Sequence, residues 1–426
     1  MLFALSLAEG VRPGILAAAA AALVAGAVFS AGLEPARDAL SGLTAPLDFA
    51  SDFVAAEDLV MGRDLYSPDR GRRHAAILGT SSVELVGPYY PKPPVMPLVV
   101  VPLVRLGFVG ASRAWFVITL VFLWILGHFL CLVFEERRLA VRVLVFLFLV
   151  LWPPTLHNLE RGQWSVLLAA SMATGWHALS RGHPRMGGAF IGLAGSLKVT
   201  PLGLFPYLAL RQRAAAVALG ATVLAAVALS LPATGIGAWG AFLQQSGPNL
   251  AYWETWPANT LSVDGFVARL FIGGTGEGPA IAHAPWFGRV LITLGSLALV
   301  LFALALTVRT SRPADRAREG ALFAVWTILV VLLNPLAWSH NAVLLLLPAA
   351  LILRGGSAGG RIVGVAVAVA LLSIPRAALF PIASLPGSPL RSTAVLSLHF
   401  WGAVLLLGLA AATLRANGPR DSPPKP

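Results

Sequence analysis

The chain has 426 residues, of which 57% are hydrophobic and 12% are Asp, Glu, Lys or Arg, whereas soluble domains carry about 25% charged residues. This composition excludes a soluble globular protein and predicts an integral membrane protein. The net charge of +12 would suggest nucleic-acid binding in a soluble protein, but most Arg residues fall in short segments between apolar stretches, where they orient a membrane protein, so nucleic acid is excluded as a partner.

Apolar stretches long enough to cross a bilayer as helices recur from Pro13 to Leu414. The sequence therefore predicts an all-α polytopic transmembrane bundle of about 10–13 membrane helices, some re-entrant or half-length. We expect this bundle to form one domain over residues 1–414, followed by a disordered tail over 415–426. Full spans are expected at residues 13–33, 114–134, 143–156, 164–180, 214–231, 286–308, 320–337, 341–354, 361–380 and 394–414.

Two apolar segments do not fit a simple crossing. Prolines interrupt residues 94–110 and remove helix hydrogen bonds, so this segment is expected to be re-entrant or to lie on the surface. Residues 187–210 have Arg clusters at both ends, which one crossing would place on opposite faces. We expect two half-length helices that meet near Lys198 and Pro201.

The short basic loops predict the orientation, because cytoplasmic loops are enriched in Lys and Arg. The protein is expected to be a multi-pass protein of the cytoplasmic (inner) membrane, with Arg309–Arg318 inside and the loops 34–93 and 232–285 outside. A loop carrying His157 to Gln163 should join two spans on that outer side. Nine of the 19 acidic residues lie in 34–93, so chemistry is expected on the outer face.

Asp48 and Asp52 are the first candidates for catalysis. Each precedes a Phe, and spacing of four residues places both on one face of a helix. Such a carboxylate pair supplies a general base whose pKa is raised by its neighbour. The other acids nearby are expected to be solvated or to cap helices, namely Glu57, Asp58, Asp64 and Asp69.

Lys198 and His340 stand near or within apolar segments, where a charged group needs a partner or a purpose. Lys198 either extends its ammonium to the interface or pairs with an acid, or it holds a lipid phosphate. His340 is either a structural hydrogen-bonding residue or a ligand-binding one. The single Cys131 excludes an intrachain disulfide and a Cys-based metal site.

Several short motifs occur in a fixed order along the chain. They are Asp48-Phe49 with Ala55-Ala56, Leu59, Gly62 and Tyr66; Tyr90-Pro91 with Pro93-Pro94; Gly162-Gln163; Lys198 with Pro201; Asn259 with Ser262; and Pro335 with Trp338 and His340. Together they resemble the polyprenol-phosphate-sugar-dependent membrane glycosyltransferases of glycosyltransferase family 87, formerly a domain of unknown function, whose fold is of the GT-C type. The chain departs from the family pattern at Asp52-Phe53, Trp164 and Asn341, which bears on the donor sugar more than on the fold.

The resemblance implies an inverting glycosyltransferase that moves a sugar, mannose-like, from a polyprenyl-phosphate donor to an extracytoplasmic glycolipid or glycan acceptor. It implies Asp48 as the catalytic base with Asp52 in support, and a substrate-binding set of Lys198, His340, Arg161, Gln163, Asn259, Ser262, Tyr66 and Trp338. No cofactor and no metal ligand belong to this set, and participation of a divalent ion stays open.

Two other classes remain. A transporter or flippase for a lipid-linked or anionic substrate also uses broken helices and a cation at membrane depth, although the sequence shows no inverted repeat. A structural assembly subunit would not need acids on the outer face.

Overall fold

The computed structural model describes residues 46–67, 69–79, 92–253, 261–273, 280–310, 315–355, 359–375, 378–379 and 389–416. Over these ranges the regular secondary structure is helical, and no β-strand occurs in them. The predicted all-α class is therefore confirmed. The predicted first span 13–33 and nearly all of the tail lie outside the described residues.

The helices in chain order are α4 (Leu47–Val60), α5 (Arg70–Ile77), α6 (Val95–Val104), α7 (Gly107–Val133), α8 (Leu139–Leu151), α9 (Pro153–Arg161), α10 (Ser165–Ser180), α11 (Pro184–Leu197), η2 (Thr200–Leu204), α12 (Phe205–Arg211), α13 (Arg213–Trp253), α14 (Val263–Phe271), α15 (Pro285–Arg309), α16 (Arg316–Leu332), η3 (Ser339–Leu345), α17 (Leu346–Arg354), α18 (Gly359–Ser373), α20 (Pro389–Leu396) and α21 (Leu398–Ala416).

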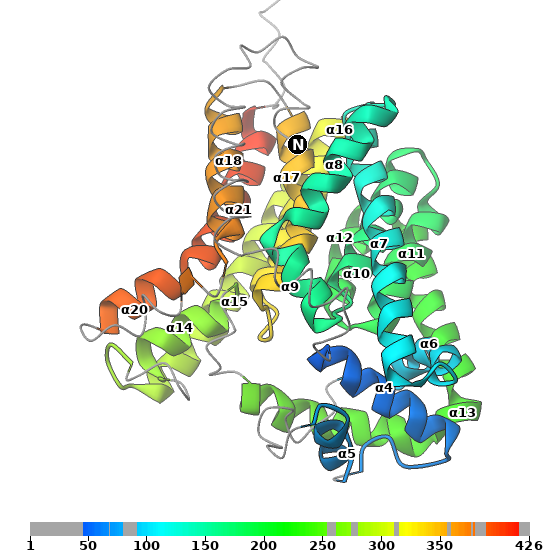
Figure 1. The fold of residues 1–426 in the computed structure, drawn as a ribbon. Coiled ribbons are helices and arrows are strands. Elements are labelled where there is room, and N and C mark those ends of the chain that lie inside the picture. Colours follow the sequence, from blue (N-terminus) through cyan, green and yellow to red (C-terminus); the bar gives the residue numbers. More distant parts are fainter. Residues whose placement is uncertain are drawn as a thin grey trace, which may run out of the picture.

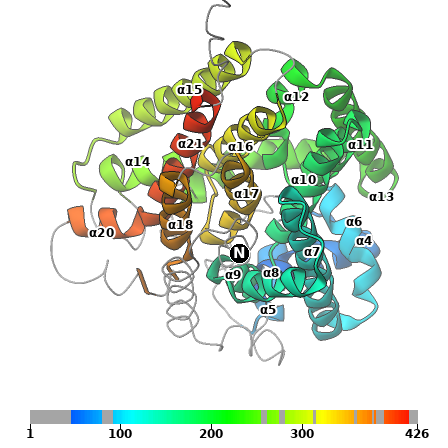
Figure 2. The ribbon, with the colours of Figure 1, turned by 90° about the horizontal axis from the view of Figure 1, so that it is seen from above.

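The long helices form a bundle, and shorter ones lie across one of its ends. Figure 1 shows α7, α11, α16, α17, α18 and α21 running side by side, with α4, α5 and α6 at the lower end. Figure 2 looks along the bundle and places α17 near its centre, between α7, α10, α16 and α18. We call the lower end in Figure 1 the α4 end.

Helix length and composition support a multi-pass membrane protein. In the described ranges four helical segments are long and apolar enough to cross a bilayer alone, within α7, α13, α15 and α21. Helices α8 and α9 form a further candidate that bends by 64° at Trp152. The shorter apolar helices are α6, η3 with α17, and α18.

Three segments that were expected to be loops contain helices. Residues 34–93 hold α4 and α5, and the stretch from His157 to Arg161 belongs to α9. Within 232–285, α13 continues to Trp253 after a kink at Gly235, whose φ is 72°. The kink turns the second half of α13 toward the α4 end, where Gln245 donates a hydrogen bond to the carbonyl of Tyr66.

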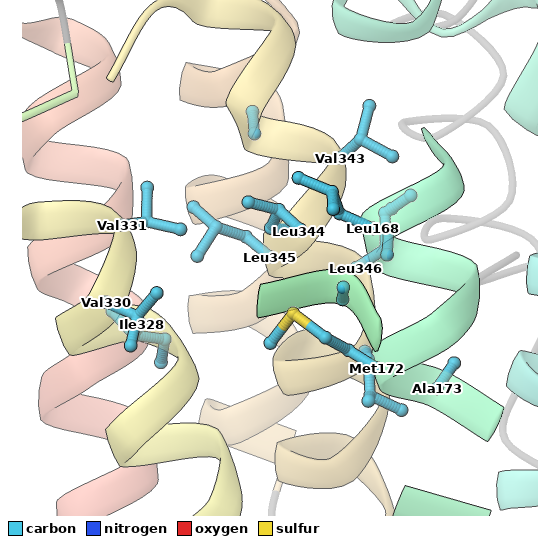
Figure 3. Packing of buried hydrophobic residues seen from close by; sticks show 14 of the residues in the cluster. Leu168, Met172, Ala173, Ile328, Val330, Val331, Val343, Leu344, Leu345 and Leu346 are labelled. Carbon is cyan, nitrogen blue, oxygen red and sulfur yellow. The ribbon is translucent and has the colours of Figure 1, made fainter. Parts of the chain in front are cut away.

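The centre of the bundle is an apolar core around α16 and α17. Every residue from Gly320 to Leu332 is buried, as expected for a helix that is hydrophobic on all sides. Figure 3 shows Leu168 and Met172 of α10 close to Leu346 of α17, with Val330 of α16 across the core. This core fixes α10 and η3, which carry residues of the candidate site at their ends.

The expected break near Lys198 is confirmed. Helix α11 ends at Leu197, Lys198 is extended with φ −145° and ψ 124°, and the chain resumes as η2 and α12. Pro201, in the first turn of η2, has no N–H to continue the ladder. The segment 94–110 is also broken, because α6 has only 10 residues and a turn at Gly107, with φ 67°, starts α7.

The end of the bundle opposite α4 gathers basic side chains from separate loops. Helix α10 runs from Ser165 near α4 to Ser180, whose hydroxyl accepts a hydrogen bond from Arg316 over 3.1 Å. Arg354 pairs with Glu135 at 2.8 Å, and Arg211 donates to the carbonyl of Thr310 over 2.8 Å. We call this the arginine-rich end; its facing the cytoplasm stays a prediction from the positive-inside rule.

Cysteine labelling tests that orientation. In a Cys131→Ser background, Arg72→Cys on α5 and Arg137→Cys at the arginine-rich end place one exposed thiol at each end of the molecule. A membrane-impermeant maleimide added to intact cells is expected to label position 72 alone, and position 137 only after the membrane is opened. Labelling of position 137 in intact cells would reverse the orientation.

Candidate active site

Helix α4 carries both candidate carboxylates toward the core. It begins after Pro46 and packs against α6, with further contacts to α7 and α9. Asp48 and Asp52 are one turn apart, and their side chains reach the residues that follow α9. The predicted shared face is therefore confirmed.

Asp48 is held by Arg161 and Gln163. The Arg161 Nε donates to Asp48 Oδ2 over 2.6 Å and the Gln163 Nε2 donates to the same oxygen over 2.8 Å, whereas Asp48 Oδ1 has only a 3.4 Å contact from Arg161 Nη2. The Asp48 side chain is 21% exposed. One carboxylate oxygen is thus engaged twice, and the other remains available.

Burial and charge act in opposite directions on Asp48. Burial alone would raise the pKa of this carboxyl, but the charge of Arg161 and its hydrogen bond hold the pKa of Asp48 well below its usual range. The prediction that Asp52 raises the pKa of its neighbour is therefore wrong. Each carboxylate has its own cation, Arg161 for Asp48 and Lys92 for Asp52.

Asp52 is fully buried and is paired with Lys92. The Lys92 Nζ lies 2.6 Å and 2.7 Å from the two oxygens of Asp52, and the indole Nε1 of Trp164 donates to Oδ2 over 2.7 Å. Lys92 Nζ also donates to the carbonyl of Asp48 over 3.3 Å. Asp52 therefore links α4 to the residues just before α6 and to the residue just before α10.

Lys92 and Trp164 are site residues that sequence reasoning missed. The chain has only three Lys, at positions 92, 198 and 425, so a Lys beside Pro93-Pro94 was a usable signal. Trp164 was noted only as a departure from the family pattern. Its contact with Asp52 gives that departure a physical reason.

Gly162 sets the direction of the two consecutive side chains that hold the acids. Its φ of 66° ends α9 in the left-handed region, which favours glycine. A Cβ on Gly162 would lie 2.5 Å from the Cβ of Phe49, and the Gly162 carbonyl accepts a hydrogen bond from Trp115 over 3.0 Å. Close packing of α4 on this turn directs Gln163 to Asp48 and Trp164 to Asp52.

His340 and Trp338 reach the same site from η3 and the turn before it. The ring of Trp338 lies under the guanidinium of Arg161, 5.1 Å from its centroid. His340 is buried, and its ring centroid lies 5.4 Å from that of His157. The Nδ1 of His157 forms a hydrogen bond with the hydroxyl of Ser339 over 2.7 Å. Within the described part of the chain, the Nδ1 of His340 has no hydrogen-bond partner.

Lys198 is the site cation without a fixed partner. Its ammonium makes no hydrogen bond or ion pair with the residues that the structure describes, while the charges of Lys92, Asp48 and Asp52 act on it. Its charge also acts on His340. Arg161 therefore pairs with Asp48, and Lys198 and His340 lie within electrostatic range of it.

The remaining predicted site residues lie in supporting positions or outside the described ranges. Tyr66 is buried against Phe242 and donates its hydroxyl to the Lys92 carbonyl over 2.8 Å. Ser262 caps α14 by accepting from the Gly265 N–H over 2.9 Å. Asn259 lies outside the described residues. The substrate contacts expected of these three residues stay predictions.

The other acids near α4 differ from expectation at one position. Asp58 is fully buried and pairs with Arg73 at 2.7 Å, so it is neither solvated nor a cap. Asp64 accepts from the N–H of Tyr66 over 2.9 Å, as a turn residue does. No group of three His, Cys, Asp or Glu side chains within the described ranges has a geometry to hold a metal ion.

The fold and this site define a polytopic membrane protein that has two acids and several basic side chains at one end of its bundle. The model of glycosyltransferase family 87 matches residues 90–293, and this match confirms the family that the motifs predicted. The match covers just under half of the chain and indicates a membrane glycosyltransferase. Lys92, Arg161, Gln163 and Lys198 fall inside the matched region, whereas Asp48 and His340 fall outside it. No curated protein and no solved structure matches the chain.

Replacement of Asp52 by Asn is expected to destabilise the fold, because it leaves the buried ammonium of Lys92 without a counter-charge. The expected cost is about 3–5 kcal/mol. The measurement is the thermal unfolding midpoint of the purified protein in detergent, with Asp69→Asn, an exposed acid, as the matched control.

A second variant separates charge pairing from other effects. Asp52→Asn combined with Lys92→Met removes both charges and should recover part of the lost stability. An unchanged midpoint for Asp52→Asn would show that the pair does not hold the site together.

Proposed function

We propose that the protein transfers a sugar, mannose-like, from a polyprenyl-phosphate donor to a glycolipid or glycan acceptor with inversion at the anomeric carbon. The observation that carries this proposal is the position of Asp48, a partly exposed carboxylate within electrostatic range of Lys198, whose ammonium has no fixed partner among the described residues. An inverting transfer from a phosphate leaving group needs a base and a phosphate-binding cation close to each other.

Asp48 Oδ1 is the atom proposed to act as general base. Arg161 and Gln163 both donate to Oδ2, so Oδ1 has the more available lone pairs. Oδ1 is therefore the oxygen proposed to meet the hydroxyl of the sugar acceptor. The acceptor oxygen attacks the anomeric carbon, the bond from that carbon to the phosphate oxygen breaks, and the acceptor proton passes to Oδ1. The polyprenyl phosphate leaves with the bonding electrons.

Lys198, Arg161 and His340 are proposed to bind the donor phosphate. Lys198 occupies the gap between α11 and η2, and the apolar residues Leu193, Val199 and Phe205 near this gap are exposed. An isoprenoid chain can lie along these side chains while its phosphate reaches the Lys198 ammonium. The buried His340 Nδ1 is available as a further hydrogen-bonding atom.

Arg161 gives this arrangement a way to activate the base when the donor is present. A carboxylate tied to a guanidinium is a weak base, and the phosphodiester anion of the donor can compete for the same guanidinium. Movement of Arg161 from Asp48 to the donor phosphate would raise the pKa of Asp48 and increase its basicity. The donor would thereby prepare the base that its own transfer needs.

A flippase or transporter is the second candidate, since a broken helix with a cation at its break also suits that class. The paired carboxylates favour the enzyme, because transport of an anion gains nothing from two acids. The fixed contacts of both acids across α4, α6 and α9 also favour a rigid site.

The reaction itself is tested with purified protein and a panel of labelled polyprenyl-phosphate sugars. Glycosylated product is expected with the wild type and with Asp69→Asn, and its rate should fall at least about 100-fold with Asp48→Asn, whose shape is nearly unchanged. Movement of intact donor across a vesicle membrane without glycosyl transfer would favour the flippase, and full activity of Asp48→Asn would exclude Asp48 as the base.

Lys198→Met removes the charge and keeps much of the apolar stem. The apparent KM for the donor is expected to rise about 10- to 100-fold, as for loss of one charge-assisted hydrogen bond, while the unfolding midpoint stays unchanged. Arg213→Met, an exposed basic residue at the arginine-rich end, is the control. Equal donor KM values for both variants would remove Lys198 from the phosphate site.

The pH dependence tests the link between Arg161 and Asp48. Activity requires the carboxylate form, and in the free enzyme Arg161 lowers the pKa of Asp48, so wild-type kcat/KM should persist on the acid side below the usual Asp pKa of about 3.9. Arg161→Gln leaves burial as the main influence and should move the acid limb of kcat/KM upward. Arg72→Gln should not. An unmoved limb in Arg161→Gln would contradict the coupling.

A further inference from the structure

A second pocket lies at the arginine-rich end, where the ends of α7, α10 and α17 meet the start of α16. It is narrow, with a cavity volume of about 20 Å³, which is room for about one water molecule. Its lining includes Phe129, Trp176 and Leu351 on the apolar side and His177, Arg316 and Arg354 on the polar side. None of these residues belongs to the candidate active site.

The polar side of the pocket carries more positive than negative charge. The guanidinium groups of Arg181, Arg316 and Arg354 lie within electrostatic range of one another, and Glu135 is the acid among them. Glu135 pairs with Arg354 at 2.8 Å. The other acids near this end are engaged elsewhere: Arg138 pairs with Glu136, Arg211 bonds Glu319, and Asp315 caps α16 by accepting from the N–H of Arg318.

Two of the three guanidinium groups keep donors available. Arg316 donates to the neutral hydroxyl of Ser180 over 3.1 Å. The exposed Arg181 side chain forms no hydrogen bond or ion pair with any residue in the described ranges. A like-charged cluster of this kind is stabilised by an anion that accepts several N–H bonds at once.

We propose that the arginine cluster at this pocket binds the phosphate group of an anionic membrane lipid. The guanidinium fork matches a phosphate in geometry, and basic pockets between membrane helices are suited to lipid headgroups. Such a lipid would hold α10, α16 and α17 together at their ends. Because α10 and η3 begin at the candidate site, this ligand also stabilises the frame of that site.

The test uses the full-length protein, purified in a neutral detergent, and its unfolding midpoint during titration with phosphatidic acid. A ligand that binds only the folded protein raises the midpoint with concentration. We expect a rise with phosphatidic acid and none with phosphatidylcholine of the same chains. Arg316→Gln and Arg181→Gln should each weaken the apparent affinity about tenfold, which is the loss of about 1.4 kcal/mol.

Arg309→Gln is the matched control, since Arg309 is exposed at the end of α15 and does not line the pocket; Figure 2 shows α15 apart from α7 and α10. Equal weakening by Arg309→Gln would overturn the site in favour of general surface attraction. An equal rise with phosphatidylcholine would also overturn it. Inorganic phosphate giving the same rise at the same concentration would overturn the lipid as ligand. Sugar transfer is not measured, so the outcome is independent of the proposed function.

Discussion

The buried ion pair between Asp52 and Lys92 is the interaction on which the site depends. The Asp52 side chain is fully buried and that of Lys92 is only 10% exposed, so a lone charge at this position would be costly. The pair, with the Trp164 indole as a third member, fixes α4 relative to α6 and to the start of α10. Asp48 is one turn from Asp52 on the same rigid helix, so its position against Arg161 and Gln163 follows from this anchor.

The two acids thus have separate tasks set by their surroundings. Asp52 is fully buried and bonded on both oxygens, which suits a structural anchor. Asp48 is partly exposed, with one oxygen engaged twice and the other nearly free, which suits a group that meets substrate. Their cations differ in the same way: the Lys92 side chain is 10% exposed, whereas that of Arg161 is 19% exposed and lies over the ring of Trp338.

Much of the fold was predictable because membrane spans are long apolar runs. Hydropathy located α7, α15 and α21, and the Arg clusters with Pro201 predicted the break at Lys198. Helix α5 and the second half of α13 were expected to be loops, since the positive-inside rule placed residues 34–93 and 232–285 in long outer segments. Their helical form depends on packing at the α4 end, for example the contact of Gln245 with Tyr66, which no local pattern reveals.

The sequence indicated which residues form the candidate site, but not which acid pairs with which cation. The family resemblance brought Asp48, Arg161, Gln163, Lys198 and His340 to one end of the bundle, and the structure places them there. The partners of Asp52 lie 40 and 112 residues away in sequence, and nothing local indicates that Lys92 neutralises Asp52 while Arg161 takes Asp48. The prediction that one acid raises the pKa of the other was wrong because each acid is paired with its own cation.

The most direct test of the account is a structure of the protein bound to a non-transferable polyprenyl-phosphonate sugar. The account predicts a phosphonate oxygen within hydrogen-bond distance of Lys198 Nζ, with the Arg161 guanidinium moved from Asp48 to the phosphonate and Asp48 Oδ1 facing the anomeric carbon. A phosphonate bound away from Lys198, with Arg161 still paired to Asp48, would contradict it.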